Sequence, residues 1–225
     1  MSSLPEYDPL LLLASGSSGR RELLTRARID FRARAADVDE DAVLTAAMSA
    51  ADGLTPDEQV LVLARAKAQA GLEASDGGYV VLGCDSMLEV DGQVLGKPHT
   101  AERARERWRQ LRGRSGILHT GHWLIDDRDA EDGGSGAALG AAASTVVHFA
   151  AITDAELDAY IATGEPLGVA GAFTIDGIGA PFIERIEGDP STVVGLSLPL
   201  LRTLLAEIGM PISALWTVPA AHDQE

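Results

Sequence analysis

The chain has 225 residues, 46% of them hydrophobic, so it can bury a sizeable core and fits one α/β domain better than several. Its 34 acidic and 18 basic residues give a net charge of -16, which disfavours a nucleic-acid polymer or an anionic membrane as partner, because phosphate surfaces are bound through an excess of Lys and Arg. One cysteine, Cys84, excludes an internal disulfide and is compatible with a reducing compartment.

The first residues are acidic and precede a very short apolar run, which is not typical of a signal peptide, and no run reaches membrane-spanning length. We therefore expect a cytoplasmic protein. Only two of the basic residues are lysines, Lys67 and Lys97. In an arginine-rich chain, two retained lysines suggest sites that need a compact ammonium, although chance in the composition is an alternative.

The stretch from Leu10 to Leu24 predicts a strand at 10–14, a loop of small residues at 15–19 and a helix that begins at Arg20. The amides at a helix N-terminus are unsatisfied and carry partial positive charge, and small residues let an anion approach them. The pattern matches neither the dinucleotide fingerprint nor the P-loop, so by itself it indicates an anion site only weakly.

A second strand is expected at 29–35, and an acidic segment at 37–41 follows it. Such a run is usually a solvated turn, but carboxylates are also the ligands that Mg²⁺ takes. Thr55 and Glu58 then form a capping box that predicts a helix to about residue 75. Lys67 lies at the border of the apolar stripe of this helix, so its ammonium either extends to solvent or contacts an anion.

The apolar run at 79–84 predicts a central strand that ends at Asp85. Ligands of open α/β sheets bind beyond the carboxyl ends of strands, which makes Asp85 a site candidate by position. A hairpin is expected at 87–95, and it would return Lys97 toward Asp85.

Further along, the sequence predicts an arginine-rich helix at 100–111, a strand at 144–149, a helix that starts from a capping box at Thr153 and a last helix at 197–208. His119 and His122 could suggest metal ligands, but a strand places them on opposite faces, so we favour structural roles for them and for His148. The acidic and then Gly/Ala-rich segment at 126–143 is interpreted as a flexible insertion without a catalytic role.

Several of these motifs resemble those of the Maf family of nucleotide pyrophosphatases. Residues 14–24, ASGSSGRRELL, resemble the family signature Ala-Ser-x-Ser-Pro-Arg-Arg-x-x-Leu-Leu, with Ser18 in place of its proline and Gly19 in place of its first arginine. The Lys-Ala at Lys67, the Gly-Cys-Asp-Ser at Asp85 and the Gly-Lys-Pro at Lys97 resemble further family motifs. The resemblance extends from about residue 10 to residue 209, apart from the insertion.

The resemblance implies an α/β chain with the Maf/ITPase-like fold, in which helices flank a mixed central sheet with a cleft for a nucleotide. Residues 1–225 would then form one domain with two lobes around the cleft. It also implies a nucleoside triphosphate pyrophosphatase that acts as a homodimer and hydrolyses canonical or modified nucleotides to the monophosphate and pyrophosphate. A divalent cation, Mg²⁺ or Mn²⁺, is expected.

The resemblance assigns roles to the matching residues of this chain. Asp85 would be the proton acceptor, and Glu40 and Asp85 would hold the metal. The expected phosphate-binding residues are Ser15, Ser17, Arg20, Lys67 and Lys97.

Three family positions distinguish pyrimidine-directed members (Arg, Thr, Gln) from those that act on methylated guanine nucleotides (Trp, Gln, Glu). Gly19, Ser86 and Asp176 occupy these positions here and fit neither set, so the preferred base stays open. Two other classes remain as alternatives: a nucleotidyltransferase, which would need an acceptor substrate, and a non-catalytic nucleotide-binding regulator of cell division. The carboxylates and both lysines favour an enzyme.

Overall fold

The computed structural model describes residues 9–51 and 53–217. The N-terminal segment for which we expect no signal peptide lies mostly outside these residues. The described chain forms a seven-stranded mixed sheet in the order β2-β1-β3-β5-β6-β7, with β4 also beside β3. The expected α/β class with a mixed sheet is confirmed. The strands are β1 (Leu11–Ala14), β2 (Arg32–Arg34), β3 (Val80–Val90), β4 (Gln93–Leu95), β5 (Ser115–Asp126), β6 (Ala138–Phe149) and β7 (Ile183–Glu187).

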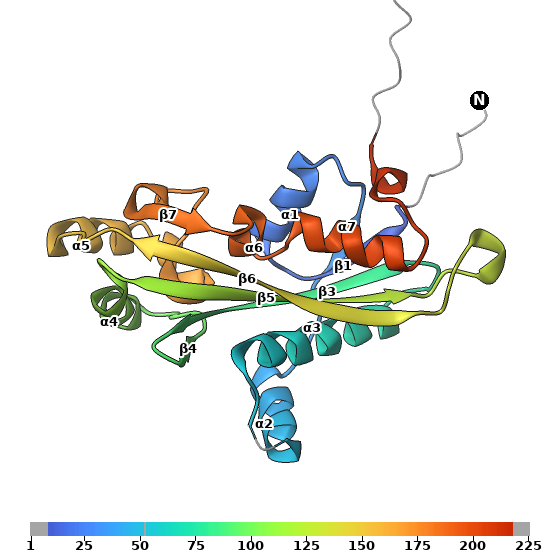
Figure 1. Ribbon diagram of the computed structural model, residues 1–225, viewed down its shortest axis with the longest axis horizontal. Helices are drawn as coiled ribbons and strands as arrows, with labels where there is room; N and C mark the ends of the chain where they lie inside the picture. Colours follow the sequence, from blue (N-terminus) through green and yellow to red (C-terminus); the bar gives the residue numbers. More distant parts are fainter. Residues whose placement is uncertain (1–8, 52, 218–225) are drawn as a thin grey trace, which may run out of the picture.

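Helices cover both faces of the sheet (Figure 1). One face packs against α3, and the other packs against α1, α6 and α7, while α4 and α5 lie toward the end of the sheet that carries β7. In the described residues, no helix is both long enough and apolar enough to cross a bilayer. The helices are α1 (Ser18–Arg26), α2 (Glu40–Ala50), α3 (Pro56–Glu73), α4 (Ala101–Leu111), α5 (Asp154–Ala162), α6 (Pro190–Val194) and α7 (Leu198–Glu207). Short 3-10 turns are η1 (Ala130–Asp132), η2 (Glu165–Gly168), η3 (Ala170–Ala172), η4 (Ala180–Phe182) and η5 (Ile212–Leu215).

The long helix α3 lies very close to the sheet because glycines underlie it. A Cβ atom on Gly83 of β3 would lie 2.1 Å from the carbonyl oxygen of Ala64, and one on Gly121 of β5 would lie 2.3 Å from that of Val60. Both contacts are with backbone, so a side chain at either glycine would push the helix away. This close approach brings Lys67 of α3 directly over β3.

The two largest hydrophobic clusters of the described residues stabilise the two ends of the sheet. One lies between β1, β3 and the helices α1 and α7. The other surrounds Trp108 of α4, whose ring makes edge contacts with Phe149, Tyr160 and Phe182. The indole Nε1 of Trp108 donates to the carbonyl of Ala172 at 2.7 Å, which fixes the segment around η3 to this second core.

The structure corrects the expected boundaries of β3. The sequence predicts a strand that ends before Asp85 and a separate hairpin strand after it, whereas β3 runs without a break from Val80 to Val90. Asp85 therefore lies in the middle of a strand rather than beyond its end. Strand β5 pairs with β3 along almost its whole length, which keeps the polar residues Asp85 and Ser86 in the ladder.

The expected insertion at 126–143 is also corrected, because both of its ends belong to the sheet. Strand β5 continues to Asp126, β6 begins at Ala138, and the two pair from one end to the other. A small residue is needed at Gly140, where a Cβ atom would lie 2.5 Å from the ring of its cross-strand neighbour Trp123. A Gly/Ala run has no hydrophobic alternation, so the sequence gives no strand signal there.

Helix limits differ from the predictions at three places. Helix α1 begins at Ser18 rather than at Arg20, so Gly19 is in its first turn. Helix α2, which begins at Glu40 after the N-cap Asp39, is absent from the sequence prediction, because an acidic run indicates a solvated turn or metal ligands rather than a helix. The region after Met210 includes η5, and Trp216 forms an isolated bridge with Ile29.

Candidate active site

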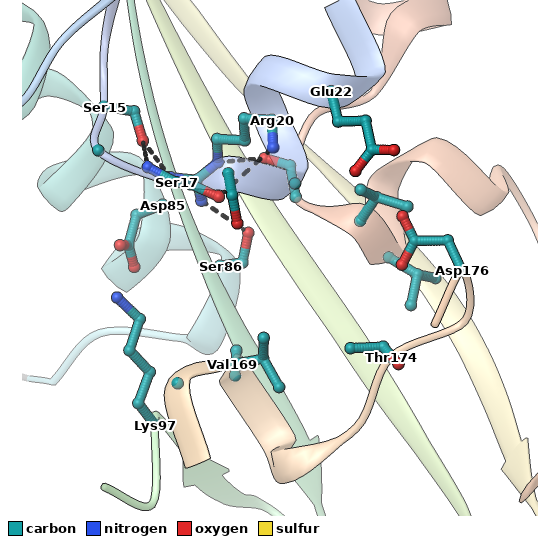
Figure 2. Close-up of a pocket in the computed structure, with 18 of the residues that line it drawn as sticks. Ser15, Ser17, Arg20, Glu22, Asp85, Ser86, Lys97, Val169, Thr174 and Asp176 are labelled. Carbon is teal, nitrogen blue, oxygen red and sulfur yellow. Dashed lines mark hydrogen bonds between the residues drawn. The ribbon is translucent and has the colours of Figure 1, made fainter. Parts of the chain in front are cut away.

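A cleft enters the sheet where one edge of β3 has no neighbour. Strand β1 pairs with β3 only as far as Leu82, and β4 pairs with it only from Leu88. Among the described residues, no strand pairs with the stretch between these two points on that edge, and a cleft of about 680 Å³ opens there. Every residue that the sequence assigns to the site lines this cleft: Ser15, Ser17, Gly19, Arg20, Glu40, Lys67, Asp85, Ser86, Lys97 and Asp176. Figure 2 labels Ser15, Ser17, Arg20, Asp85, Ser86, Lys97 and Asp176 among them.

Lys67 joins the two carboxylates of the cleft. Its Nζ lies 2.5 Å from Oδ1 of Asp85 and 2.8 Å from Oε1 of Glu40. The side chains of Lys67 and Asp85 are only 11% and 9% exposed, whereas Glu40, at the first position of α2, is 46% exposed. The lysine thus ends at the carboxylates and does not extend to bulk solvent.

The two carboxyl groups differ in their proton affinity. Burial raises the pKa of Asp85 above its usual value, although the charges of Lys67 and Arg20 oppose this effect. Burial acts in the same direction on Glu40, but the hydrogen bond from Lys67 and the charges of Lys67, Lys97 and Arg20 outweigh it and lower its pKa. Glu40 is therefore the stronger acid and Asp85 the better proton acceptor.

The oxygen donors of this pair suit a hard divalent cation. Both carboxylates reach the same point, which the ammonium of Lys67 occupies. In the part of the chain that the structure describes, no cluster of three or more His, Cys, Asp or Glu residues could hold a metal ion. Mg²⁺ is commonly held by one or two carboxylates together with substrate phosphates and water, and Glu40 and Asp85 fit that pattern.

Arg20 is fixed between three elements at the floor of the cleft. Its Nε donates to the carbonyl of Gly195 at 2.6 Å, Nη1 donates to Ser15 Oγ at 3.1 Å, and Nη2 donates to Ser86 Oγ at 3.0 Å. It is 8% exposed and brings a fixed positive charge to the cleft. These contacts bind β1, β3 and the end of α6 together.

The serines expected to bind phosphate also shape the loop before α1. Ser17 is the N-cap of the helix, and its Oγ accepts the amide of Arg20 at 3.4 Å. Ser15 Oγ accepts the amide of Ser17 at 3.2 Å. Because the first amides of a helix have no partner within the helix, this loop presents donors to an anion in the cleft.

Lys97 and Asp176 lie on opposite sides of the cleft (Figure 2). Lys97 follows β4 and extends toward Asp85, whereas Asp176 belongs to the far wall. Positive charge therefore gathers near Asp85, and a carboxylate lies away from it. On the α1 side, a Cβ atom on Gly19 would contact the side chain and the carbonyl oxygen of Val194, both at 3.4 Å.

His119, His122 and His148 each have protein partners on both ring nitrogens. His122 is buried: its Nδ1 lies 3.1 Å from the Thr120 carbonyl, and its Nε2 accepts the amide of Ser197 at 2.8 Å. Burial lowers the pKa of His122 to about 4, so the ring is neutral near pH 7. His119 bonds to Ser144 and Glu89, and His148 bonds to Ser115 and Glu187, as structural roles require.

Two residues near the cleft escaped the sequence analysis. Thr120 Oγ1 donates to the Thr192 carbonyl at 2.9 Å and lies 2.9 Å from Ser86 Oγ, so it supports both Ser86 and α6. Glu165, in the far wall, accepts four hydrogen bonds. A threonine within a strand has no distinguishing signal, and the Gly-Glu-Pro turn marks Glu165 only as part of a turn.

Comparison with known proteins places the chain in a family. Three curated bacterial relatives, each named nucleoside triphosphate pyrophosphatase, are about half identical to it. The relative from Salinispora tropica is 54% identical over 92% of this chain and 87% of its own length. The relative from Leifsonia xyli subsp. xyli is 53% identical over 92% of this chain and 96% of its own length. The relative from Nocardia farcinica is 51% identical over 93% of this chain and 98% of its own length.

A solved Mycobacterium abscessus structure, titled nucleoside-triphosphatase / dITP/XTP pyrophosphatase, covers 88% of this chain and 93% of its own, with 11% identity. Its TM-score is 0.37, which is too low to bear on the fold. The model of the family described as Maf-like protein matches residues 10–208. The chain therefore belongs to the Maf-like protein family.

Proposed function

We propose that this protein is a nucleoside triphosphate pyrophosphatase, which hydrolyses the bond between the α and β phosphates and yields a nucleoside monophosphate and pyrophosphate. Relatives at 51–54% identity over most of their length carry that name. Within the molecule, the observation that carries the proposal is the meeting of Lys67 with Asp85 and Glu40 in a cleft that Arg20 and Lys97 also line.

The cations of the cleft would bind and neutralise the triphosphate. Arg20 is fixed by three hydrogen bonds and still has N–H groups for a phosphate oxygen. Lys67 has three N–H donors, so it can keep its carboxylates and contact a phosphate. The amides at the start of α1, which follow Ser15 and Ser17, add further donors. Positioning and charge neutralisation supply most of the catalysis in phosphoryl chemistry.

Asp85 would accept the proton of the attacking water. As the oxygen of that water bonds to the α-phosphorus, the bond to the bridging oxygen breaks and pyrophosphate leaves with the electron pair. A raised pKa makes the carboxylate a better base near neutral pH than a solvated aspartate. A divalent ion, Mg²⁺ or Mn²⁺, would be held by Glu40 and Asp85, and when bound it would supply charge stabilisation.

Base preference is proposed to depend on Gly19, Ser86 and Asp176. The hydroxyl of Ser86 is already engaged by Arg20 and Thr120. Gly19 leaves space where the family signature has an arginine, so we propose a wide base pocket with Asp176 on its far wall. A permissive pocket should hydrolyse several nucleotides at similar rates. A different rate for every nucleotide would count against it.

A homodimer and a cytoplasmic location remain proposals that rest on the family resemblance and on composition. So does the expectation that no nucleic-acid polymer and no membrane is a partner. The two-lobed arrangement of a single domain is likewise a proposal. Light scattering of the purified chain would test the homodimer, and a monomer at working concentrations would reject it.

Pyrophosphate release tests the proposed reaction. A panel of canonical and modified nucleoside triphosphates is offered to the wild type with Mg²⁺, with Mn²⁺ and with chelator. The Asp85→Asn variant should lose about a hundredfold or more of the rate while its circular dichroism is retained. Asp91→Asn, at an exposed turn, is the matched control. A folded, active Asp85→Asn variant would reject the role of Asp85, and nucleotide binding without release would favour the regulator.

A further inference from the structure

The carboxylate of Glu165 accepts hydrogen bonds from four donors in the far wall of the cleft. Its Oε1 accepts from the hydroxyl of Thr174 at 2.5 Å, from the amide of Gly179 at 2.9 Å and from the hydroxyl of Tyr160 at 3.0 Å. Its Oε2 accepts from the amide of Ile178 at 2.9 Å. One side chain thus satisfies two hydroxyls and two backbone amides.

These contacts hold both ends of one short loop, residues 174–179. Thr174 is at its beginning, and Ile178 and Gly179 are at its end, so the loop folds around the carboxylate. Gly177 allows the close wrap, because a Cβ atom there would lie 2.5 Å from Oε2 of Glu165. Asp176, at the middle of the loop, lines the cleft.

The anchor itself is tied to the second core. Tyr160, which donates to Glu165, packs its ring against Trp108 and Phe182. Among the described residues, the donors to the Glu165 carboxylate are two hydroxyls and two backbone amides, whose dipoles balance its charge. Burial acts to raise the pKa of Glu165, but these hydrogen bonds outweigh it and keep the pKa below its usual value.

The loop lies at the end of the cleft where a base would lie. Lys97 and Asp85 lie on the opposite side of the view from Thr174 and Asp176 (Figure 2). A triphosphate bound near Lys67, Lys97 and Arg20 would direct its nucleoside toward this wall. The shape of the loop then decides which base edges meet Asp176 and the neighbouring backbone.

We propose that Glu165 is a positioning residue for base selection: by holding both ends of the loop at 174–179, it fixes the wall that the base contacts. This inference rests on the proposed function, because it takes the ligand to be a nucleoside triphosphate. Glu165 acts through the loop and touches no reacting atom. Its removal should change the discrimination among bases and leave the binding of the triphosphate group itself unchanged.

Glu165→Gln is the direct variant. The amide keeps the size of the side chain but turns one acceptor group into a donor. That donor then faces the backbone N–H of either Ile178 or Gly179 and leaves it unsatisfied. Thr174→Val is a milder variant that removes one of the four donors, and Thr174→Ser keeps that hydroxyl. Glu156→Gln is the matched control, since Glu156 caps α5 through Thr153 on an exposed surface.

The experiment measures dissociation constants of the full chain by calorimetry with Mg²⁺. The probes are the α,β-methylene analogues of the four canonical triphosphates, which cannot be cleaved at that bond, and tripolyphosphate, which has no base. The ratio of the largest to the smallest of the four dissociation constants measures base discrimination. We expect Glu165→Gln to reduce this ratio by about tenfold, as the loss of a hydrogen bond to a charged group implies. The dissociation constant of tripolyphosphate for Glu165→Gln should lie within about twofold of that for the wild type. Thr174→Val should show a smaller reduction, and Thr174→Ser and Glu156→Gln none.

A retained spread in Glu165→Gln would overturn the inference. So would a wild type that binds all four analogues alike, or a parallel loss of tripolyphosphate binding, which would indicate a general structural defect. Pyrophosphate release from hydrolysable triphosphates, measured on the wild type, reports on the proposed function separately. A wild type that selects among the analogues but releases no pyrophosphate would reject the reaction and leave the role of Glu165 standing.

Discussion

The Lys67 ammonium lies 2.5 Å from a carboxylate oxygen of Asp85, and both side chains are almost fully buried. A charge in such a place is costly unless it is paired, so each group depends on the other. The contact exists because α3 crosses β3 at Gly83, two residues before Asp85, where a side chain would separate the helix from the sheet. Helix packing thus sets the electrostatics of the cleft.

Loss of Lys67 should destabilise the fold through Asp85. Lys67→Met leaves the Asp85 carboxylate buried beside Glu40 without its cation, and we expect a loss of about 3 kcal/mol in the free energy of unfolding. The double variant Lys67→Met/Asp85→Asn should recover most of it, because no unpaired buried charge remains. Urea unfolding of the four proteins at pH 7 measures the coupling. Additive effects would show that the two groups are independent.

Gly83→Ala should move α3 away from the sheet. The added Cβ atom would lie 2.1 Å from the Ala64 carbonyl oxygen and 2.5 Å from the Ala68 amide, and neither is a flexible side-chain end. We expect a loss of about 1–3 kcal/mol in the free energy of unfolding, together with a reduced rate of pyrophosphate release because Lys67 moves with the helix. Gly96→Ala, where an added Cβ meets nothing within 4 Å, is the control. Equal stabilities of the two variants would contradict the tight contact.

Lys97→Ala should weaken the binding of the phosphates and not of the base. Removing a charged donor from a phosphate is expected to raise the KM for every nucleoside triphosphate by about tenfold, and the Kd of tripolyphosphate by a similar factor. Arg109→Ala, on the exposed side of α4, removes the same charge elsewhere and should change neither value. An increase limited to some bases would place Lys97 at the nucleoside.

His122 should make the fold sensitive to mild acid. Its pKa is about 4 in the fold and about 6.5 in an unfolded chain, so the unfolded state takes up the proton first as the pH falls. The contribution of neutral His122 to the free energy of unfolding is fully present above pH 6.5 and is lost between pH 6.5 and pH 4. It amounts to about 3 kcal/mol.

His122→Gln removes this titration but keeps an acceptor for the amide of Ser197. The free energy of unfolding, measured by urea at several pH values from 7 to 4, should therefore fall less steeply in the variant than in the wild type. His148→Gln, at a more exposed position, serves as the control. Parallel curves for the wild type and His122→Gln would refute the assignment.

The local features of the chain could be predicted from the sequence because they depend on neighbours along it. The capping boxes at Thr55 and Thr153 are present as predicted, since each joins residues three positions apart. The small-residue loop before α1 and the place of Lys67 at the border of the apolar stripe of α3 follow from short patterns in the same way.

The tertiary structure decided where those features meet. The gap between β1 and β4 on β3, which opens the cleft at Asp85, depends on strand pairing. Arg20 finds its partner at Gly195, 175 residues away, and the Gly/Ala run of β6 is a strand because it pairs with β5. Contacts between residues so distant in the chain are set by the register of the sheet and the packing of helices on it, and no local pattern encodes them.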